Sequence, residues 1–124
     1  MIGVLAVADY REFESWRRAR FAVCAALDFA KSIPRLHGRK NLADEINRLS
    51  VSILDTLSRG LERGGDSAFI EKALEKVNRL DRTLRELAER HGLSSATSHH
   101  LQRELKEVRR MLQETSQETK ANKP

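Results

Sequence analysis

Apolar residues recur at helical spacing in four stretches of the chain, and Gly or Pro separates these stretches. The spacing predicts helices over about 9–31, 40–63, 67–91 and 95–114. Pro34 cannot continue the first helix and pushes Ile33 toward an extended conformation. Short connections favour antiparallel neighbours, so we expect residues 1–115 to form an all-α, up-down four-helix bundle. Residues 116–124 lack apolar spacing and are predicted to be a disordered polar tail.

The third stretch has the most regular pattern. Apolar residues follow an alternating three-and-four spacing from Ile70 to Leu87, which is typical of bundle packing. The Gly64-Gly65 pair stops the preceding helix, and Asp66 or Ser67 is a suitable N-cap for the next one. Gly60 falls inside the pattern of the second helix, which indicates a weakened last turn or a close helix contact.

The first stretch is apolar on two sides. One stripe consists of Phe13, Trp16, Ala19, Val23, Leu27 and Ala30, and the other of Phe21, Ala22, Ala25 and Phe29. If a small bundle covers one side of each helix, the second stripe needs a partner, which predicts a barrel-like homo-oligomer. Its interface would include Phe21, Ala25, Asp28 and Phe29. Asp28 would pair with an arginine of another subunit or lie exposed at the rim. In the alternative monomer, apolar residues 2–7 cover part of this stripe.

Basic groups outnumber acidic groups by 23 to 18, giving a formal net charge of +5, and most of them are arginines. The planar guanidinium matches phosphate oxygens, so this excess favours nucleic acid as a partner. The alternative is a solvated helical surface laced with i,i+4 ion pairs: Asp44–Arg48, Asp55–Arg59, Glu75–Arg79, Asp81–Arg85 and Glu86–Arg90. Such pairs contribute only a few tenths of a kcal/mol each and leave the positive excess in place.

Basic side chains gather in three places, which we expect to contact nucleic acid: the first connection (Arg35, His37, Arg39, Lys40), one flank of the third helix (Lys72, Lys76, Arg79, Arg90) and one side of the fourth (Arg103, Lys106, Arg109, Arg110). No aromatic platform for base stacking is visible, so the predicted binding is electrostatic and weakly sequence-specific. Five copies around an axis would together carry about +25, a field able to attract phosphate backbones.

The chain lacks the residue patterns of catalytic and metal sites. His99 and His100 are adjacent and point about 100° apart on a helix, a poor geometry for chelation. Cys24 has no neighbouring His and is expected to be a buried, inert thiol. We therefore predict neither an enzyme nor a bound metal or cofactor. A single cysteine, no signal-peptide pattern and no apolar run of roughly 20 residues favour a cytoplasmic protein without membrane contact.

Four segments carry a resemblance to a known family: Phe13-Glu14-Ser15-Trp16-Arg17-Arg18-Ala19, Ser32-Ile33-Pro34-Arg35-Leu36-His37-Gly38, Leu49-Ser50-Val51-Ser52-Ile53-Leu54 and Leu105-Lys106-Glu107-Val108-Arg109-Arg110-Met111-Leu112. Together they resemble a bacterial superfamily of four-helix-bundle proteins. It comprises the proteins encoded by intervening sequences in large-subunit ribosomal RNA genes and the accessory variability determinant (Avd) of diversity-generating retroelements. The likeness covers roughly Tyr10 to Leu112, and the loop containing Pro-Arg and the closing helix look more like the Avd branch. Where the intervening-sequence branch usually carries an Asn-Ile-Ala-Glu-Gly-like segment, this chain has Asp55-Thr56-Leu57-Ser58-Arg59-Gly60.

The resemblance implies a homopentamer with a basic surface. In the Avd branch it also implies association with a reverse transcriptase and template RNA during mutagenic complementary-DNA synthesis. The accessory protein itself is not the polymerase in that branch. Two other functions stay open from the sequence: an intervening-sequence protein of unknown role, and an interaction scaffold that binds no nucleic acid.

Overall fold

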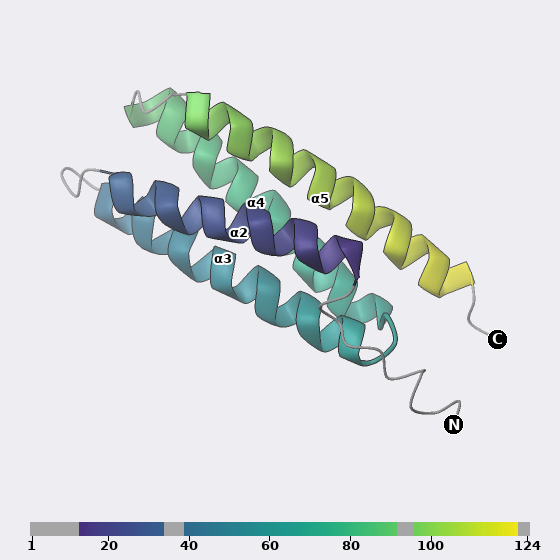
Figure 1. Cartoon of the computed structure of the whole chain (residues 1–124). Helices are drawn as coiled ribbons and strands as arrows, with labels where there is room; N and C mark the ends of the chain where they lie inside the picture. Colours follow the sequence, from purple (N-terminus) through teal and green to yellow (C-terminus); the bar gives the residue numbers. More distant parts are fainter. Residues whose placement is uncertain (1–12, 34–38, 92–95, 122–124) are drawn as a thin grey trace.

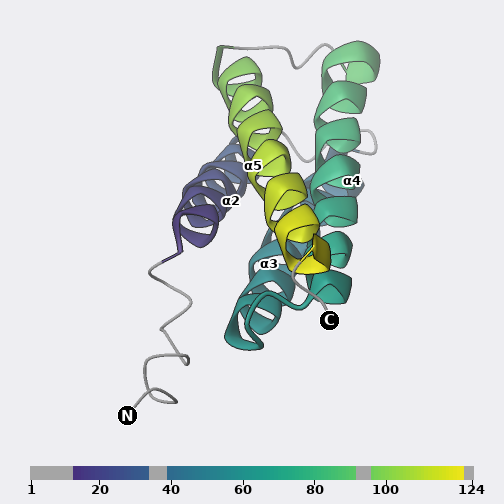
Figure 2. The same ribbon diagram turned by 90° about the vertical axis from the view of Figure 1, so that its right-hand side faces the viewer.

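The computed structural model describes residues 13–33, 39–91 and 96–121, and within them the regular structure is helical throughout. The helices are α2 (Glu14–Ser32), α3 (Arg39–Glu62), α4 (Ser67–His91) and α5 (Ala96–Ala121). Each packs against its neighbours in the chain, and α5 also packs against α2, so the four close into a ring (Figure 1). After a quarter turn about the vertical, α2 and α4 are seen on opposite sides, with α3 and α5 between them (Figure 2). The single chain is therefore an up-down-up-down four-helix bundle, as predicted.

The core is built from the apolar stripes that the sequence pattern indicates. The α4 side chains from Ile70 to Leu87 that follow the three-and-four spacing are at most 1% exposed. They meet equally buried side chains of α3 and α5: Ile46, Ile53, Leu57, Leu101, Leu105, Val108 and Leu112. Their regular spacing keeps these six side chains on the inner side of α4, which explains why the predicted bounds of this helix, 67–91, agree with the structure.

The ends of α2 are set by local backbone preferences. Ile33 is extended, with φ −75° and ψ 125°, which confirms the effect expected of the following proline. Phe13 is also extended, with φ −68° and ψ 134°, and acts as the N-cap residue. The helix α2 therefore begins at Glu14, later than the predicted start near residue 9, and residues 9–12 lie outside the described part of the chain.

The α3–α4 connection is a tight glycine turn. Gly64 and Gly65 have φ of +77° and +88°, a region that favours glycine, and the backbone N–H groups of Gly65 and Asp66 donate to the Gly60 carbonyl oxygen at 2.9 and 3.0 Å. Asp66 Oδ1 accepts from the backbone N–H of Ala68, confirming its capping role. A Cβ on Gly60 would lie 2.9 Å from the Cβ of Phe69, so the close helix contact is confirmed.

The argument that α2 needs a partner molecule for its second apolar stripe is wrong for Ala22 and Phe29, whereas Phe21 of the same stripe is exposed. A helix in a closed ring has two neighbours, and α2 packs against both α3 and α5. On one side, Trp16 Nε1 donates to Ser58 Oγ of α3 at 2.9 Å. On the other, Ala22 and Phe29 are 1% and 8% exposed within the single chain. Phe29 is therefore a core residue of this bundle, although it was expected at an oligomer interface.

The predicted disordered tail is largely helical. α5 continues to Ala121 instead of ending near residue 114, and its last turns extend beyond the first turn of α2 (Figure 1). Ser116 is 5% exposed, and its Oγ lies 3.5 Å from Glu71 Oε1 of α4. Ser116 lies four residues after Leu112 and therefore on the same buried side of α5. Because Ser116 is polar, a prediction from apolar spacing ends the helix too early. Residues 122–124 lie outside the described part.

Candidate nucleic-acid interface

The four basic residues predicted on one side of α5 do not form one strip. Arg103 and Lys106 are exposed, and neither makes an ion pair with any residue that the structure describes. Arg109 turns toward α4, where its Nη2 lies 3.5 Å from Asp81 Oδ2. Arg110 binds acidic groups of its own helix. Only the first two therefore remain available to a phosphate group.

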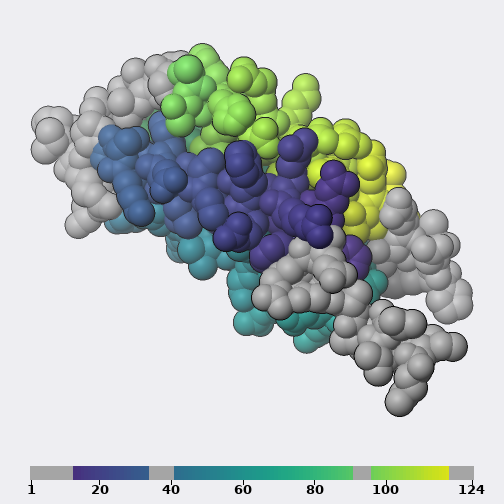
Figure 3. Space-filling view, viewed as in Figure 1, coloured from purple at the N-terminus to yellow at the C-terminus, as the bar shows by residue number. Residues whose placement is uncertain are grey.

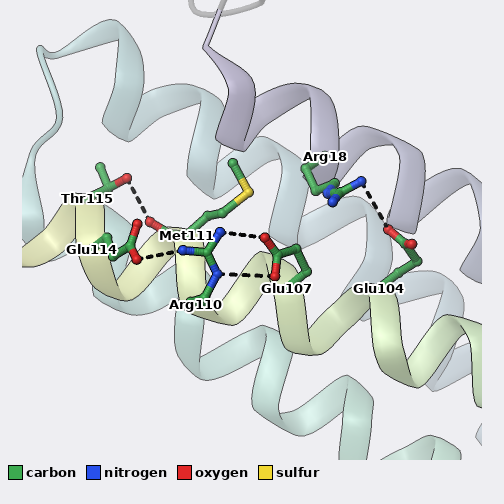
Figure 4. A network of polar contacts seen from close by, with 7 residues as sticks. All are labelled: Arg18, Glu104, Glu107, Arg110, Met111, Glu114 and Thr115. Carbon is green, nitrogen blue, oxygen red and sulfur yellow. Dashed lines mark hydrogen bonds and ion pairs between the residues drawn. The ribbon is translucent and has the colours of Figure 1, made fainter.

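Arg110 is held between two carboxylates (Figure 4). Its Nε and Nη2 donate to Glu107 at 3.1 and 2.5 Å, and its Nη1 donates to Glu114 at 2.6 Å. The hydrogen bonds from Arg110 lower the pKa of Glu107 below its usual 4.5, and those to Glu107 raise the pKa of Arg110 further above its already high ordinary value. An incoming phosphate would have to displace both carboxylates, so Arg110 is a weak candidate for binding.

Asp81 makes Arg109 a structural residue. The Asp81 side chain is only 9% exposed and also pairs with Arg85, at 3.1 Å. The Arg109 side chain is 27% exposed, and its Nε is buried without a hydrogen-bond partner in the described part of the chain. The pair links α4 to α5 in a partly buried position, where removal of one partner leaves the other charge poorly solvated.

The basic flank of α4 is also largely engaged. Lys76 is half-buried and donates to Ser52 Oγ at 2.6 Å and Thr56 Oγ1 at 3.0 Å on α3. Arg79 lies 3.7 Å from Glu45, and Arg90 lies 3.1 Å from Glu86. Lys72 is exposed, with its Nζ 5.5 Å from the ring centre of Phe69, and is the least engaged member of this group.

Several predicted i,i+4 pairs form, and others are replaced. Asp55–Arg59, Asp81–Arg85 and Glu86–Arg90 are present at 3.1–3.3 Å. Arg79 contacts Glu45 of α3 instead of Glu75, and Arg48 also contacts Glu45. Glu45 lies on the side of α3 that faces α4, so a tertiary neighbour outcompetes the local one at Arg79.

The predicted loop cluster lies mostly where the structure gives no description. Arg35 and His37 are outside the described residues. Arg39 and Lys40 belong to the first turn of α3, and their side chains are likewise outside what is described.

A basic group on α2 was missed by the sequence prediction. Arg17, Arg18 and Arg20 are all exposed. Arg18 Nη1 lies 3.9 Å from Glu104 Oε2 of α5, and Figure 4 shows its guanidinium reaching across the gap between the two helices. The run Arg17-Arg18-Ala19-Arg20, with three arginines around one buried alanine, was the available signal, since a helix that buries Ala19 must turn its neighbours outward.

The outer surface of α2 also holds the other residues assigned to an oligomer interface. Phe21 is 59% exposed, Asp28 is exposed, and Ala25 is partly buried against the core. Cys24 is exposed, contrary to the prediction of a buried thiol, because it lies one turn from Phe21 on the outward side of α2.

In residues 13–33, 39–91 and 96–121, no three His, Cys, Asp or Glu side chains gather in an arrangement able to hold a metal ion. None of the described helices combines the length and apolar character needed to cross a bilayer. Comparison with protein-family models, curated proteins and solved structures finds no match to this chain.

Proposed function

We propose that this chain is a non-catalytic, cytoplasmic protein that binds the phosphate backbone of RNA or DNA on the outer surface of α2 and α5. As the resemblance to the Avd branch implies, it would act as a homo-oligomeric accessory protein of a retroelement reverse transcriptase. The observation that supports binding most directly is the exposure of several basic side chains on this surface. Arg17, Arg20, Arg103 and Lys106 are exposed on these two helices, which pack against each other.

The basic groups of α3 and α4 support this choice of surface by contrast. Arg48, Arg59, Arg79 and Arg90 each face a carboxylate of the chain itself, which partly neutralises their field. Binding that involves four phosphate contacts predicts a slope of about −2.8 for the logarithm of affinity against the logarithm of salt concentration on single strands. The affinity would then fall about 50-fold when salt rises from about 50 to 200 mM.

The test is fluorescence anisotropy with labelled RNA and DNA oligonucleotides at several salt concentrations. A variant with Arg17, Arg20, Arg103 and Lys106 all changed to Gln is expected to bind much more weakly and with a flatter salt dependence. The matched control changes Arg48, Arg59, Arg79 and Arg90 to Gln and thus removes the same charge from other faces. Equal losses in the two variants would show that net charge, and not this surface, governs binding. No binding by the original protein at low salt would refute the proposed function.

The oligomeric part of the proposal rests on the resemblance, because Phe29 and Ala22 are core residues of the single chain. Light scattering is expected to give the mass of five 14.2 kDa chains, about 71 kDa. A monomer would remove the pentamer from the proposal. A neighbouring reverse-transcriptase gene with template and variable repeats would support the accessory role, whereas a position inside a ribosomal RNA gene would favour the intervening-sequence branch.

A scaffold function without nucleic acid is the second candidate, and exposed Phe21 is the observation that favours it. A partner helix could bury this ring together with the partly buried Ala25. Such a partner would bind with little salt dependence, which distinguishes it from a phosphate backbone.

A further inference from the structure

A hollow of about 560 Å³ opens between α2 and α5 on the surface described above. Glu14, Arg17, Arg18 and Phe21 line it from α2, and His100 and Glu104 line it from α5. In the space-filling view α2 crosses the face of the molecule with α5 alongside it (Figure 3). The volume falls within the range of sites that hold small organic groups, roughly 300–1,000 Å³.

The hollow contains an aromatic ring that is unusually accessible. Phe21 is 59% exposed, although a phenylalanine side chain gains free energy by leaving water. Arginines lie beside it at positions 17 and 18, so the ring is flanked by groups that bind phosphate. An exposed aromatic ring next to arginines is the combination on which unpaired bases stack while their backbone is neutralised. The sequence pattern showed no aromatic platform for base stacking, whereas the folded surface presents this one exposed ring beside arginines.

Glu104 adds an unsatisfied hydrogen-bond acceptor to the same hollow. Its Oε2 is buried and has no hydrogen-bond partner among the residues that the structure describes, and Arg18 Nη1 lies 3.9 Å away. A charged acceptor left in this state costs free energy, which a donor entering the hollow would recover. A rotation of the partly exposed side chain would bring the carboxylate to such a donor, and rotamer changes of this kind are common on binding. Phosphate cannot be that donor, because it carries only acceptors at neutral pH, whereas the amino group of a base can.

We infer that this hollow binds an unpaired nucleotide of a single-stranded nucleic acid, with its base stacked on Phe21. The exocyclic amino group of the base donates to Glu104, and the adjoining phosphate lies against Arg17 and Arg18. This inference rests on the proposed function and specifies its substrate as single-stranded. A paired base is excluded because its Watson–Crick edge is occupied and both its faces are stacked within the duplex. Cytosine is preferred over uracil, because cytosine has its amino group where uracil has a carbonyl oxygen, and the one Watson–Crick donor of uracil, N3–H, lies between two carbonyl oxygens that the carboxylate repels.

The experiment measures the binding of labelled oligocytidine, oligouridine and a mixed-sequence duplex by anisotropy, each in ribo and deoxyribo form. Phe21→Ala is expected to weaken single-strand binding about tenfold and to leave duplex binding within about twofold, since stacking is lost and the arginines remain. Phe21→Trp keeps the stacking face and is expected to restore single-strand affinity. Val51→Ala is the matched control, because Val51 is also 59% exposed but lies on α3.

Glu104→Gln tests the assignment of the amino group. A carboxylate accepts from cytosine and repels the carbonyl of uracil, whereas an amide can pair with either base. We expect the original protein to prefer oligocytidine over oligouridine about tenfold, and this ratio is expected to fall close to one in Glu104→Gln. Because the comparison is a ratio, the general gain in affinity from removing a negative charge cancels.

The possible outcomes separate the two proposals. If no nucleic acid binds at low salt, the proposed function fails. If strands and duplexes bind but Phe21→Ala changes neither, or weakens both equally, only the nucleotide site is refuted. A cytosine preference that persists in Glu104→Gln refutes the role of the carboxylate. If Phe21→Ala instead lowers the molar mass in solution with single-strand affinity unchanged, the hollow is a contact between copies of the chain, which also overturns the inference.

Discussion

Arg109 provides a sharp test of the distinction between structural and available basic residues. The substitution Arg109→Ala removes the α5 partner of Asp81, whose side chain is 9% exposed, while the Arg109 side chain itself is 27% exposed. Breaking a fully buried ion pair by removing one partner costs about 3–5 kcal/mol. Asp81 keeps Arg85 at 3.1 Å, and the pair is not fully desolvated, so we expect a loss of about 1–2 kcal/mol.

The assay is urea unfolding followed by circular dichroism, at one protein concentration because assembly would couple to unfolding. The control is Arg103→Ala, the same change on an exposed position of the same helix, expected to alter stability by less than about 0.5 kcal/mol. Nucleic-acid affinity is expected to show the opposite order, with Arg103→Ala the weaker binder.

A double-mutant cycle with Asp81→Ala isolates the pairwise contribution. We expect a coupling free energy of about 1 kcal/mol or more between positions 81 and 109, since residues in one charge network are not additive. If Arg109→Ala is no less stable than Arg103→Ala and the coupling is close to zero, the pair makes no net contribution, and the assignment of Arg109 to the structure is refuted.

Three further predictions concern stability. Gly60→Ala is expected to lower the free energy of unfolding by about 1 kcal/mol, because the new Cβ, 2.9 Å from Phe69 Cβ, costs more than the gain in helix propensity; a more stable variant in urea would contradict this. Glu107→Gln is expected to melt at a lower temperature than the original protein at neutral pH, because the ionised carboxylate pairs with Arg110. This difference is expected to disappear as the pH falls through the pKa of Glu107, which Arg110 holds below 4.5. A difference independent of pH would argue against the pair. Ending the chain after residue 115 is expected to reduce the helical signal at 222 nm and to lower stability by about 1 kcal/mol, because buried Ser116 is lost; an unchanged signal would restore the disordered tail.

The sequence pattern predicts the bundle because the periodicity of each helix is a local property. The α4 helix agrees at both ends, since a glycine turn precedes it and its apolar spacing is uninterrupted. The effect of Pro34 on Ile33 and the cap at Asp66 are also local and are also confirmed. Spacing alone could not tell that the two apolar sides of α2 face two different neighbours, and Phe29 was misassigned for that reason.

The candidate site was predicted less well, because the availability of a charge depends on neighbours distant in sequence. Lys76 is engaged by Ser52 and Thr56, and Arg109 by Asp81, and none of these contacts follows from helical spacing. The hollow between α2 and α5 combines residues more than 70 positions apart. No local pattern marks such a site.

One contact in the ring, between α2 and α5, joins described helices that are not successive in the sequence. The contacts α2–α3, α3–α4 and α4–α5 form between successive helices, whereas α2–α5 closes the ring. Contacts between neighbours in sequence form quickly, and the closing contact carries the larger entropic cost of a long loop. Because the hollow lies along the α2–α5 contact, a ligand bound there would hold these two helices together and stabilise the closed ring against unfolding.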